Sequence, residues 1–216
     1  MNPASQCPWL GQYPEGVPAS IDVAAFPTLA ALLEASFSQF ASRAALSYMG
    51  REYSYAELER QSRALAAFLQ SRGLKKGDRV AVMMPNVPQY AETVAAVLRA
   101  GMVVVNVNPL YTPRELEHQL NDSGARALVV MENFADTVQA CLPQTQVQNV
   151  ILASVGERLG WARGAVVDFV LRHVRKAVPA FRLPGAVRYA KAIAKGRRLP
   201  FQAPPVLPDD IAVLQY

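Results

Sequence analysis

Short apolar runs that alternate with helix-like segments limit the possible folds of this 216-residue chain more than any other feature. The runs lie at 79–84, 102–107, 126–131 and 149–153, and each gap between them is long enough for a helix. Runs that lack polar alternation are typical of strands buried on both faces. Strands that alternate with helices form parallel sheets through right-handed crossovers. The sequence therefore predicts an α/β fold with a doubly wound, mainly parallel sheet and flanking helices.

The segment before this alternation predicts two helices around a β-hairpin. Leucine and phenylalanine recur at helical spacing after Thr28, and a hairpin is expected over 44–53. Ser54 is followed three residues later by Glu57, which is the spacing of a capping box, so the second helix is expected to begin there. It should end at Gly73.

Composition and periodicity divide the chain into four segments. The N-terminal segment, 1–26, is rich in Pro and Gly and has no periodicity, so it is expected to lie over the surface as an irregular arm. The segments are the arm at 1–26, an α/β subdomain at 27–153, a basic amphipathic helical segment at 154–200, and a linker with a strand at 201–216.

The composition is that of a globular protein, with 51% hydrophobic residues. There is no run of about eighteen uncharged apolar residues, and the first residues have neither a basic start nor an apolar stretch. Both observations argue against a spanning helix and against secretion. Cys7 and Cys141 are far apart in sequence, so reduced thiols in the cytoplasm are expected.

The net charge of +5 is distributed unevenly. Residues 154–198 contain eleven Lys and Arg but only Glu157 and Asp168 as acids, which gives this segment +9 and leaves −4 for the rest. A concentrated positive field attracts anionic surfaces.

Three stretches resemble the adenylate-forming acyl-CoA synthetases, and bacterial long-chain fatty-acid CoA ligases in particular. Their order and spacing carry the resemblance, which extends over essentially the whole chain. The stretches are Gly77-Asp-Arg-Val-Ala-Val-Met-Met-Pro-Asn-Val-Pro-Gln-Tyr, Val105-Asn-Val-Asn-Pro-Leu-Tyr-Thr-Pro-Arg-Glu-Leu and the terminal Pro208-Asp-Asp-Ile-Ala-Val-Leu-Gln-Tyr.

The resemblance implies a reaction, its substrates and one site residue. A family member would join a fatty acid to ATP with Mg2+ and then pass the acyl group to coenzyme A. Tyr216 matches the start of the family's phosphate-loop motif, and the remaining nucleotide-binding segments would lie beyond it. The chain is therefore expected to be an N-terminal fragment that is inactive alone. Relatives also imply a possible homodimer.

Residues in the matching stretches also have structural interpretations. Asn86 follows a buried strand and is suited to cap the next helix. Pro109 and Pro113 bracket an extended crossing, and Gly124 should end the following helix as a left-handed cap. All four are interpreted as scaffold residues.

The rest of the sequence offers no alternative catalytic set. His118 and His173 lack a Cys, Ser or acidic partner at a recognisable motif spacing, and no metal-ligand spacing occurs. The stretch 73–77 lacks the spacing and the final Lys-Ser/Thr of a phosphate loop.

A basic amphipathic helix is predicted over 158–178. Five charged positions, including Arg172, Arg175 and Lys176, fall on one side, and apolar side chains fall on the other. One interpretation is a helix packed on the sheet with a solvated basic face; the other is peripheral contact with an anionic membrane, on the inner face of the cell membrane. Candidate membrane residues are Trp161, Phe169, Val170, Arg172, Arg175 and Lys176. Nucleic acid is not an expected partner, because stacking aromatics are not interleaved.

Two functional hypotheses follow. The first is that the chain is part of a long-chain fatty-acid CoA ligase. The alternative is a standalone amphipathic module that docks on a membrane or a partner.

Overall fold

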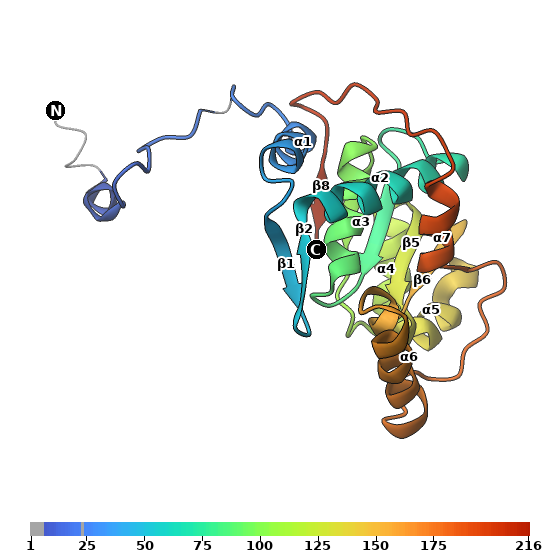
Figure 1. The fold of residues 1–216 in the computed structure, drawn as a ribbon. Helices are drawn as coiled ribbons and strands as arrows, with labels where there is room; N and C mark the ends of the chain where they lie inside the picture. The colour runs from blue at the N-terminus through green and yellow to red at the C-terminus, as the bar shows by residue number, and fades with distance from the viewer. Residues whose placement is uncertain (1–6, 23) are drawn as a thin grey trace.

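A computed structural model describes residues 7–22 and 24–216, and a six-stranded parallel sheet forms its centre (Figure 1). In spatial order the strands are β7 (Val187–Arg188), β6 (Asn149–Ala153), β5 (Ala125–Met131), β3 (Arg79–Met83), β4 (Val103–Asn106) and β8 (Val213–Gln215).

The predicted parallel arrangement is confirmed at the centre of this sheet. Strand β3 pairs in parallel with β4 on one side and with β5 on the other, so Val80 lies beside both Val104 and Ala127. Strands β7 and β8, which come from segments outside 27–153, pair in parallel at the two edges. The sheet therefore joins three of the four segments that composition distinguishes.

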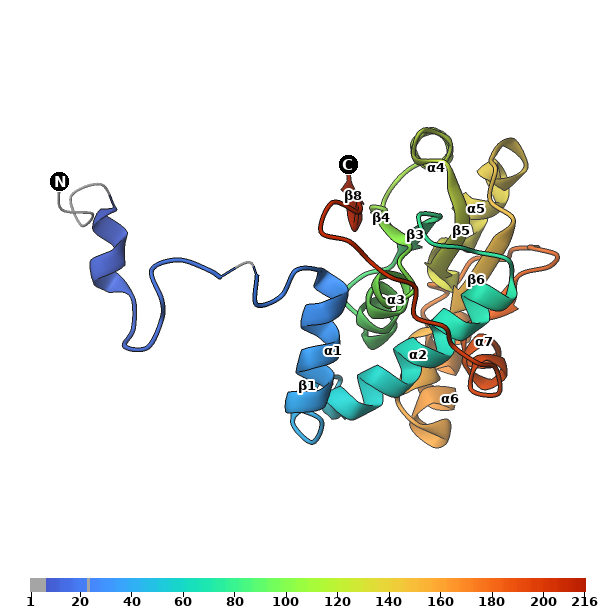
Figure 2. The ribbon, with the colours of Figure 1, turned by 90° about the horizontal axis from the view of Figure 1, so that it is seen from above.

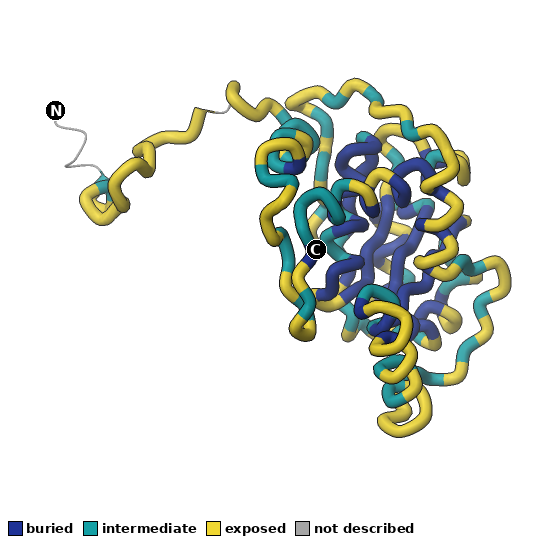
Figure 3. The backbone as a smooth tube through the Cα atoms, viewed as in Figure 1, coloured by how far each residue is buried: buried dark blue, intermediate teal, exposed yellow. Residues whose placement is uncertain are grey.

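Successive residues of each strand point to opposite faces of the sheet, and both faces are buried. Val80 and Val82 pack in one apolar cluster with Val104, whereas Ala81 and Met83 pack in another. Helices α2 (Tyr55–Ser71), α3 (Pro88–Arg99) and α7 (Tyr189–Gly196) contribute to the first cluster, and α4 (Pro113–Ser123) and α5 (Ala135–Cys141) to the second. The sheet is thus doubly wound, and it forms the dark core of Figure 3.

A small unit of α1 (Leu29–Gln39) and the hairpin β1 (Ala44–Tyr48) and β2 (Arg51–Ser54) packs beside α2 and α3. The side chain of Thr28 caps α1, and Ser54 accepts a hydrogen bond from the Glu57 amide at the start of α2. Only this half of the predicted capping box forms. The Glu57 carboxylate pairs instead with Arg51 and Arg158, because two guanidinium groups bind a carboxylate more strongly than a backbone amide does.

The N-terminal arm differs from the expectation where the structure describes it. Its residues 1–6 and 23 lie outside the described residues. Residues 8–12 form a 3-10 helix, and the described arm projects away from the body instead of lying over it (Figure 2). Trp9 and Ile21 are both exposed, so this segment has little apolar contact with the rest of the protein.

The single helix predicted over 158–178 is also wrong in its extent. The chain forms a 3-10 turn over Val155–Arg158, then α6 (Trp161–Phe169), and then a wider π-helical turn over Val170–Val174. Gly160 adopts a φ of 87°, which separates the first turn from α6. Gly156 and Gly164 pack backbone against backbone. A Cβ on Gly164 would lie only 2.3 Å from the Gly156 carbonyl oxygen, so a larger residue does not fit there.

Asp168 of α6 faces the protein body, whereas Arg163 of α6 and the basic residues Arg175 and Lys176 that follow it are exposed. Asp168 accepts hydrogen bonds from the Ser154 hydroxyl at 2.7 Å and from the Gly156 amide at 2.8 Å. Arg158 lies in a buried network with Glu57 at 2.6 Å and Glu92 at 2.8 Å. These contacts hold Asp168 and Arg158 inward, and the apolar side chains of Trp161, Val166 and Phe169 are exposed to solvent.

A titratable carboxyl lies in the turn that carries α6. The side chain of Glu157 accepts a hydrogen bond from the Ser154 amide at 3.1 Å, and burial raises the pKa of Glu157 to about 7. Because this pKa is higher in the folded chain than in the unfolded chain, the stability it provides is complete below the unfolded pKa and is lost as the pH rises through about 7.

Replacing Glu157 with Gln keeps an acceptor oxygen but removes the charge. We expect the unfolding free energy of Glu157→Gln, relative to the native chain, to increase by up to about 3 kcal/mol between pH 4.5 and pH 8. Urea unfolding followed by circular dichroism at several pH values measures this difference. A difference that does not change with pH contradicts the assignment.

Helices α2 and α7 cross in direct backbone contact at Gly196. A Cβ at this position would lie 1.8 Å from the carbonyl oxygen of Ala64, and backbone cannot move aside as a flexible side chain can. We expect Gly196→Ala to destabilise the fold by about 1–3 kcal/mol despite the better helix propensity of Ala. The exposed neighbour provides the control, since Lys195→Ala should change the stability by less than about 0.5 kcal/mol. Equal melting temperatures for the two variants would refute this close approach.

Candidate functional site

A polar pocket lies at the carboxyl ends of strands β3, β4 and β8. Its volume is about 440 Å3. Around β3 the chain changes its direction across the sheet, since β4 lies on one side and β5 on the other. Ligands of open α/β sheets bind at the carboxyl ends of strands near such a reversal. The pocket is lined by Val82, Met84, Asn86, Tyr90, Asn106, Val107, Asn108, Tyr111, Gln215 and Tyr216.

A chain of hydrogen bonds connects four elements, α3, β4, β8 and α4, around this pocket. The Tyr90 hydroxyl donates to Asn106 Oδ1 at 3.0 Å, and Asn106 Nδ2 donates to Gln215 Oε1 at 2.9 Å. The backbone carbonyl of Asn106 accepts from Gln119 Nε2 at 2.7 Å. These bonds fix the orientation of both amide side chains, so β4 and β8 present aligned dipoles to the pocket.

Tyr216 occupies the pocket edge at the end of β8. Its hydroxyl donates a hydrogen bond at 2.6 Å to Oδ2 of Asp122, which lies on α4. This bond to the Asp122 carboxylate, together with partial burial, raises the pKa of the Tyr216 hydroxyl. The phenol therefore remains protonated at neutral pH, and the bond joins the end of β8 to α4.

The residues that line the pocket include no Lys, Arg, Asp or Glu. Phosphate groups and a divalent cation both require charged partners, and Mg2+ is normally held by carboxylates. In the ranges 7–22 and 24–216, no three His, Cys, Asp or Glu side chains gather where they could hold a metal ion. The residues present therefore do not fit Mg2+, and they provide only neutral hydrogen-bonding groups.

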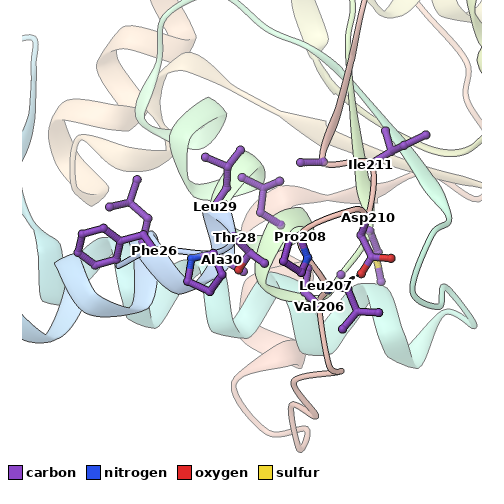
Figure 4. A pocket seen from close by; sticks show the side chains of 15 residues that line it. Phe26, Thr28, Leu29, Ala30, Val206, Leu207, Pro208, Asp210 and Ile211 are labelled. Carbon is purple, nitrogen blue, oxygen red and sulfur yellow. Dashed lines mark hydrogen bonds between the residues drawn. The ribbon is translucent and has the colours of Figure 1, made fainter. Parts of the chain in front are cut away.

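An apolar pocket of about 270 Å3 lies at the opposite ends of the same strands (Figure 4). The segment before α1, α1 itself and the linker before β8 form its walls, and the residues that precede β4 also line it. Asp210 at its rim pairs with Lys76 and accepts the Leu207 amide, so this linker is anchored. The residues that line this apolar pocket offer almost no free polar groups to a phosphate. The polar pocket is therefore the better candidate site.

Most of the polar pocket was missed by the sequence reasoning. Asn86 was expected to cap α3, but the N-cap is Val87, Pro88 occupies the first turn, and Asn86 lines the pocket. Asn106 and Asn108 lie in a stretch that resembles the family, and the sequence predicts no site role for either. The sequence did contain a signal for this pocket. Asn86 and Asn108 each follow closely on a buried apolar run, and the carboxyl ends of parallel strands meet at one edge of a sheet.

The candidate membrane residues lie on α6 and the π-helical turn, at the lower edge of the molecule in Figure 1. Trp161 is 91% exposed and Phe169 is 59% exposed, whereas Val170 is half-buried. Val166 and Val174 add to the same exposed apolar surface. In the part of the chain that the structure describes, no helix has the length and apolar character needed to cross a membrane.

The basic candidates of this region fall into two groups. Arg172 is held against the body by two hydrogen bonds of 2.8 Å to the buried Glu132 carboxylate, which also pairs with Arg188. Arg175 and Lys176 are exposed at the end of the π-helical turn, and their side chains make no hydrogen bond or salt bridge to the described residues. Lys176 has a φ of 51°, which ends the helical segment.

Comparison with curated proteins finds close relatives that are longer than this chain. The chain is 48% identical over 209 residues to the long-chain-fatty-acid–CoA ligase of Escherichia coli, covering 96% of this chain and 37% of that protein. It is 33% identical over 214 residues to the long-chain-fatty-acid–CoA ligase of Bacillus subtilis, covering 98% and 38%. The chain thus spans well under half the length of these relatives.

Solved structures share the fold. An anthranilate CoA ligase in complex with anthranoyl-AMP matches with a TM-score of 0.70 at 16% identity, covering 89% of this chain and 33% of that one. A long-chain-fatty-acid-CoA ligase from Archaeoglobus fulgidus matches with a TM-score of 0.65 at 24% identity, covering 88% and 34%. Residues 33–216 match the family described as AMP-binding enzyme, and the chain therefore belongs to the AMP-binding enzyme family.

Proposed function

We propose that residues 1–216 are the N-terminal part of an ATP-dependent long-chain fatty-acid CoA ligase. In the reaction, a carboxylate oxygen attacks the α-phosphorus of ATP and pyrophosphate leaves. The thiol sulfur of coenzyme A then attacks the acyl carbonyl carbon and AMP leaves. The observation that carries the proposal is the polar pocket at the carboxyl ends of β3, β4 and β8, which contains Tyr216 in a chain of this family. The cytoplasmic location and a homodimer belong to the same proposal.

This chain contributes uncharged side chains that line one side of the polar pocket and are already held in fixed orientations. Asn106 and Gln215 present fixed amide groups, and the Asp122–Tyr216 bond holds the Tyr216 side chain against α4. The charge that develops on the phosphates requires cationic groups and Mg2+, and none of the lining residues is charged. Residues outside 1–216 must supply those charges, so this chain alone should be catalytically silent.

Isothermal titration calorimetry of residues 1–216 with Mg-ATP should give no measurable heat of binding. Loss of several charge-assisted contacts, at roughly 1.5–3 kcal/mol each, weakens affinity by orders of magnitude. The protein extended to the length of its relatives should form acyl-CoA from a long-chain fatty acid, ATP and Mg2+. A cooperative thermal melt of the short chain is the control for folding.

Two outcomes would contradict this account. Tight ATP binding by the folded short chain would mean that the nucleotide site lies within residues 1–216. An extended protein that makes no acyl-CoA would reject the functional assignment itself.

We also propose that the surface of α6 contacts an anionic membrane. One observation favours this second function: Trp161, Val166 and Phe169 of α6 are exposed to solvent, while Asp168 of α6 and Arg172 of the π-helical turn are held against the body. An exposed indole such as Trp161 prefers the boundary between water and lipid. Arg163, Arg175 and Lys176 are exposed near the same surface, and each adds about 1 kcal/mol of attraction to anionic lipid.

Trp161 provides a direct reporter of this contact. The chain has two tryptophans, so Trp9→Phe leaves Trp161 as the only indole. Vesicles that contain phosphatidylglycerol should shift its fluorescence to shorter wavelength, and 0.5 M salt should weaken the binding because it screens the charges. Adding Val166→Asp and Phe169→Asp should abolish the shift, because both side chains are exposed on this surface.

The matched control is Leu207→Asp, Ile211→Asp, which places the same two negative charges on residues that are each 59% exposed, as Phe169 is, but lie in the linker before β8. This variant should bind vesicles normally. Equal loss of binding in the control, or no fluorescence shift in the parent, would leave α6 without a membrane function.

A further inference from the structure

A groove of about 490 Å3 lies where α7 crosses α2, outside the polar pocket and outside the α6 surface. The close contact of Gly196 with Ala64 brings side chains from the two helices to the same groove, although they are far apart in sequence. The groove is lined by Arg60, Arg63, Ala64, Gly196, Arg197, Leu199 and Phe201.

Two of the three guanidinium groups in this groove are held in place by fixed partners. Arg63 Nε donates to Glu59 Oε1 at 2.7 Å, and its guanidinium lies 5.6 Å from the ring centre of Phe201. Arg197 donates to the buried side chain of Gln61 at 3.3 Å. A guanidinium that is already oriented loses less conformational entropy when it binds a ligand.

The groove carries more positive charge than its surroundings balance. Arg60 makes no hydrogen bond or salt bridge to the described residues. Glu59 is shared between Arg63 and the buried Arg99, and Arg197 has only the neutral Gln61 as partner. Guanidinium groups that repel one another around a shared space are stabilised by an anion with several acceptor oxygens.

We propose that this groove binds a phosphate group. A phosphate presents three or more oxygens and up to two charges, which match several guanidinium forks better than a single carboxylate does. The side chains of Leu199 and Phe201 form an apolar wall next to Arg63 and Arg197, so the groove also accommodates a small apolar group attached to the phosphate. The inference is independent of the proposed ligase reaction, because Tyr216 and the polar pocket take no part in it.

Calorimetry with two soluble probes tests the site and separates the two sources of a phosphate group. Pyrophosphate represents a free phosphate ligand, and dihexanoyl phosphatidic acid, used as a monomer, represents a lipid headgroup. We expect the native chain to bind at least one probe with a Kd below about 1 mM. Dihexanoyl phosphatidylcholine should not bind, because its choline group offsets the phosphate charge.

The double variant Arg60→Ala, Arg197→Ala should weaken the binding at least tenfold. Its matched control is Arg79→Ala, Arg182→Ala, which removes the same charge from exposed positions outside the groove and outside the α6 surface and should leave the Kd within twofold. A third variant, Arg60→Lys, Arg197→Lys, retains the charge but not the planar forks and should bind more weakly than the native chain. Thermal melts establish that each variant is folded.

The results decide the proposal in either direction. Binding of pyrophosphate alone identifies a free phosphate ligand, and binding of phosphatidic acid alone identifies a lipid headgroup. Binding of either probe, or of both, supports the site if the groove variant loses that binding. No binding of either probe at 5 mM, or equal losses in the groove variant and in the control, would overturn the proposal.

Discussion

Strand β3 is hydrogen-bonded on both sides and covered by helices on both faces, and this double burial sets the positions of the surrounding elements. Because its neighbours run parallel to it, their carboxyl ends meet at one edge of the sheet. That edge collects Asn86, Asn106 and Tyr216 from three separate stretches into one pocket. The same edge receives the turn after β6 that carries α6. The pocket and the α6 surface therefore both follow from the parallel arrangement.

Buried ion pairs determine which side of α6 faces the protein. Arg158 satisfies Glu57 and Glu92, and the Tyr189 hydroxyl donates to the second oxygen of Glu92 at 2.8 Å. Desolvation raises the pKa of Glu92, while Arg158 and Tyr189 oppose that shift. A buried charge without its partner is costly, so removal of Arg158 would destabilise several elements at once. Such a network favours one arrangement of the 3-10 turn and α6 and leaves the apolar residues outside.

The sequence was a good guide where the signal is local. Apolar runs located β3, β4 and β5, and Gly124 has the left-handed φ of 64° expected of a helix cap. It was a poor guide where a side chain chooses between a local and a distant partner. Glu57 has the spacing of a cap, but two arginines, one of them 101 residues away, take its carboxylate. Asn86 has the chemistry of a cap, but Val87 and Pro88 start the helix one residue later.

The sequence by itself determined the α/β class and the parallel strands, because burial patterns and turn residues act over a few positions, and the resemblance of its stretches indicated the family. The same resemblance matches Tyr216 to the start of a functional motif, and this role stays a prediction. Only the tertiary structure decided that Asn106, Gln215 and Tyr90 share one hydrogen-bonded pocket and that the apolar side of α6 faces solvent. Periodicity describes which residues of a helix share a side. Which side is buried depends on partners such as Glu132 and Ser154, brought close only when the sheet has formed.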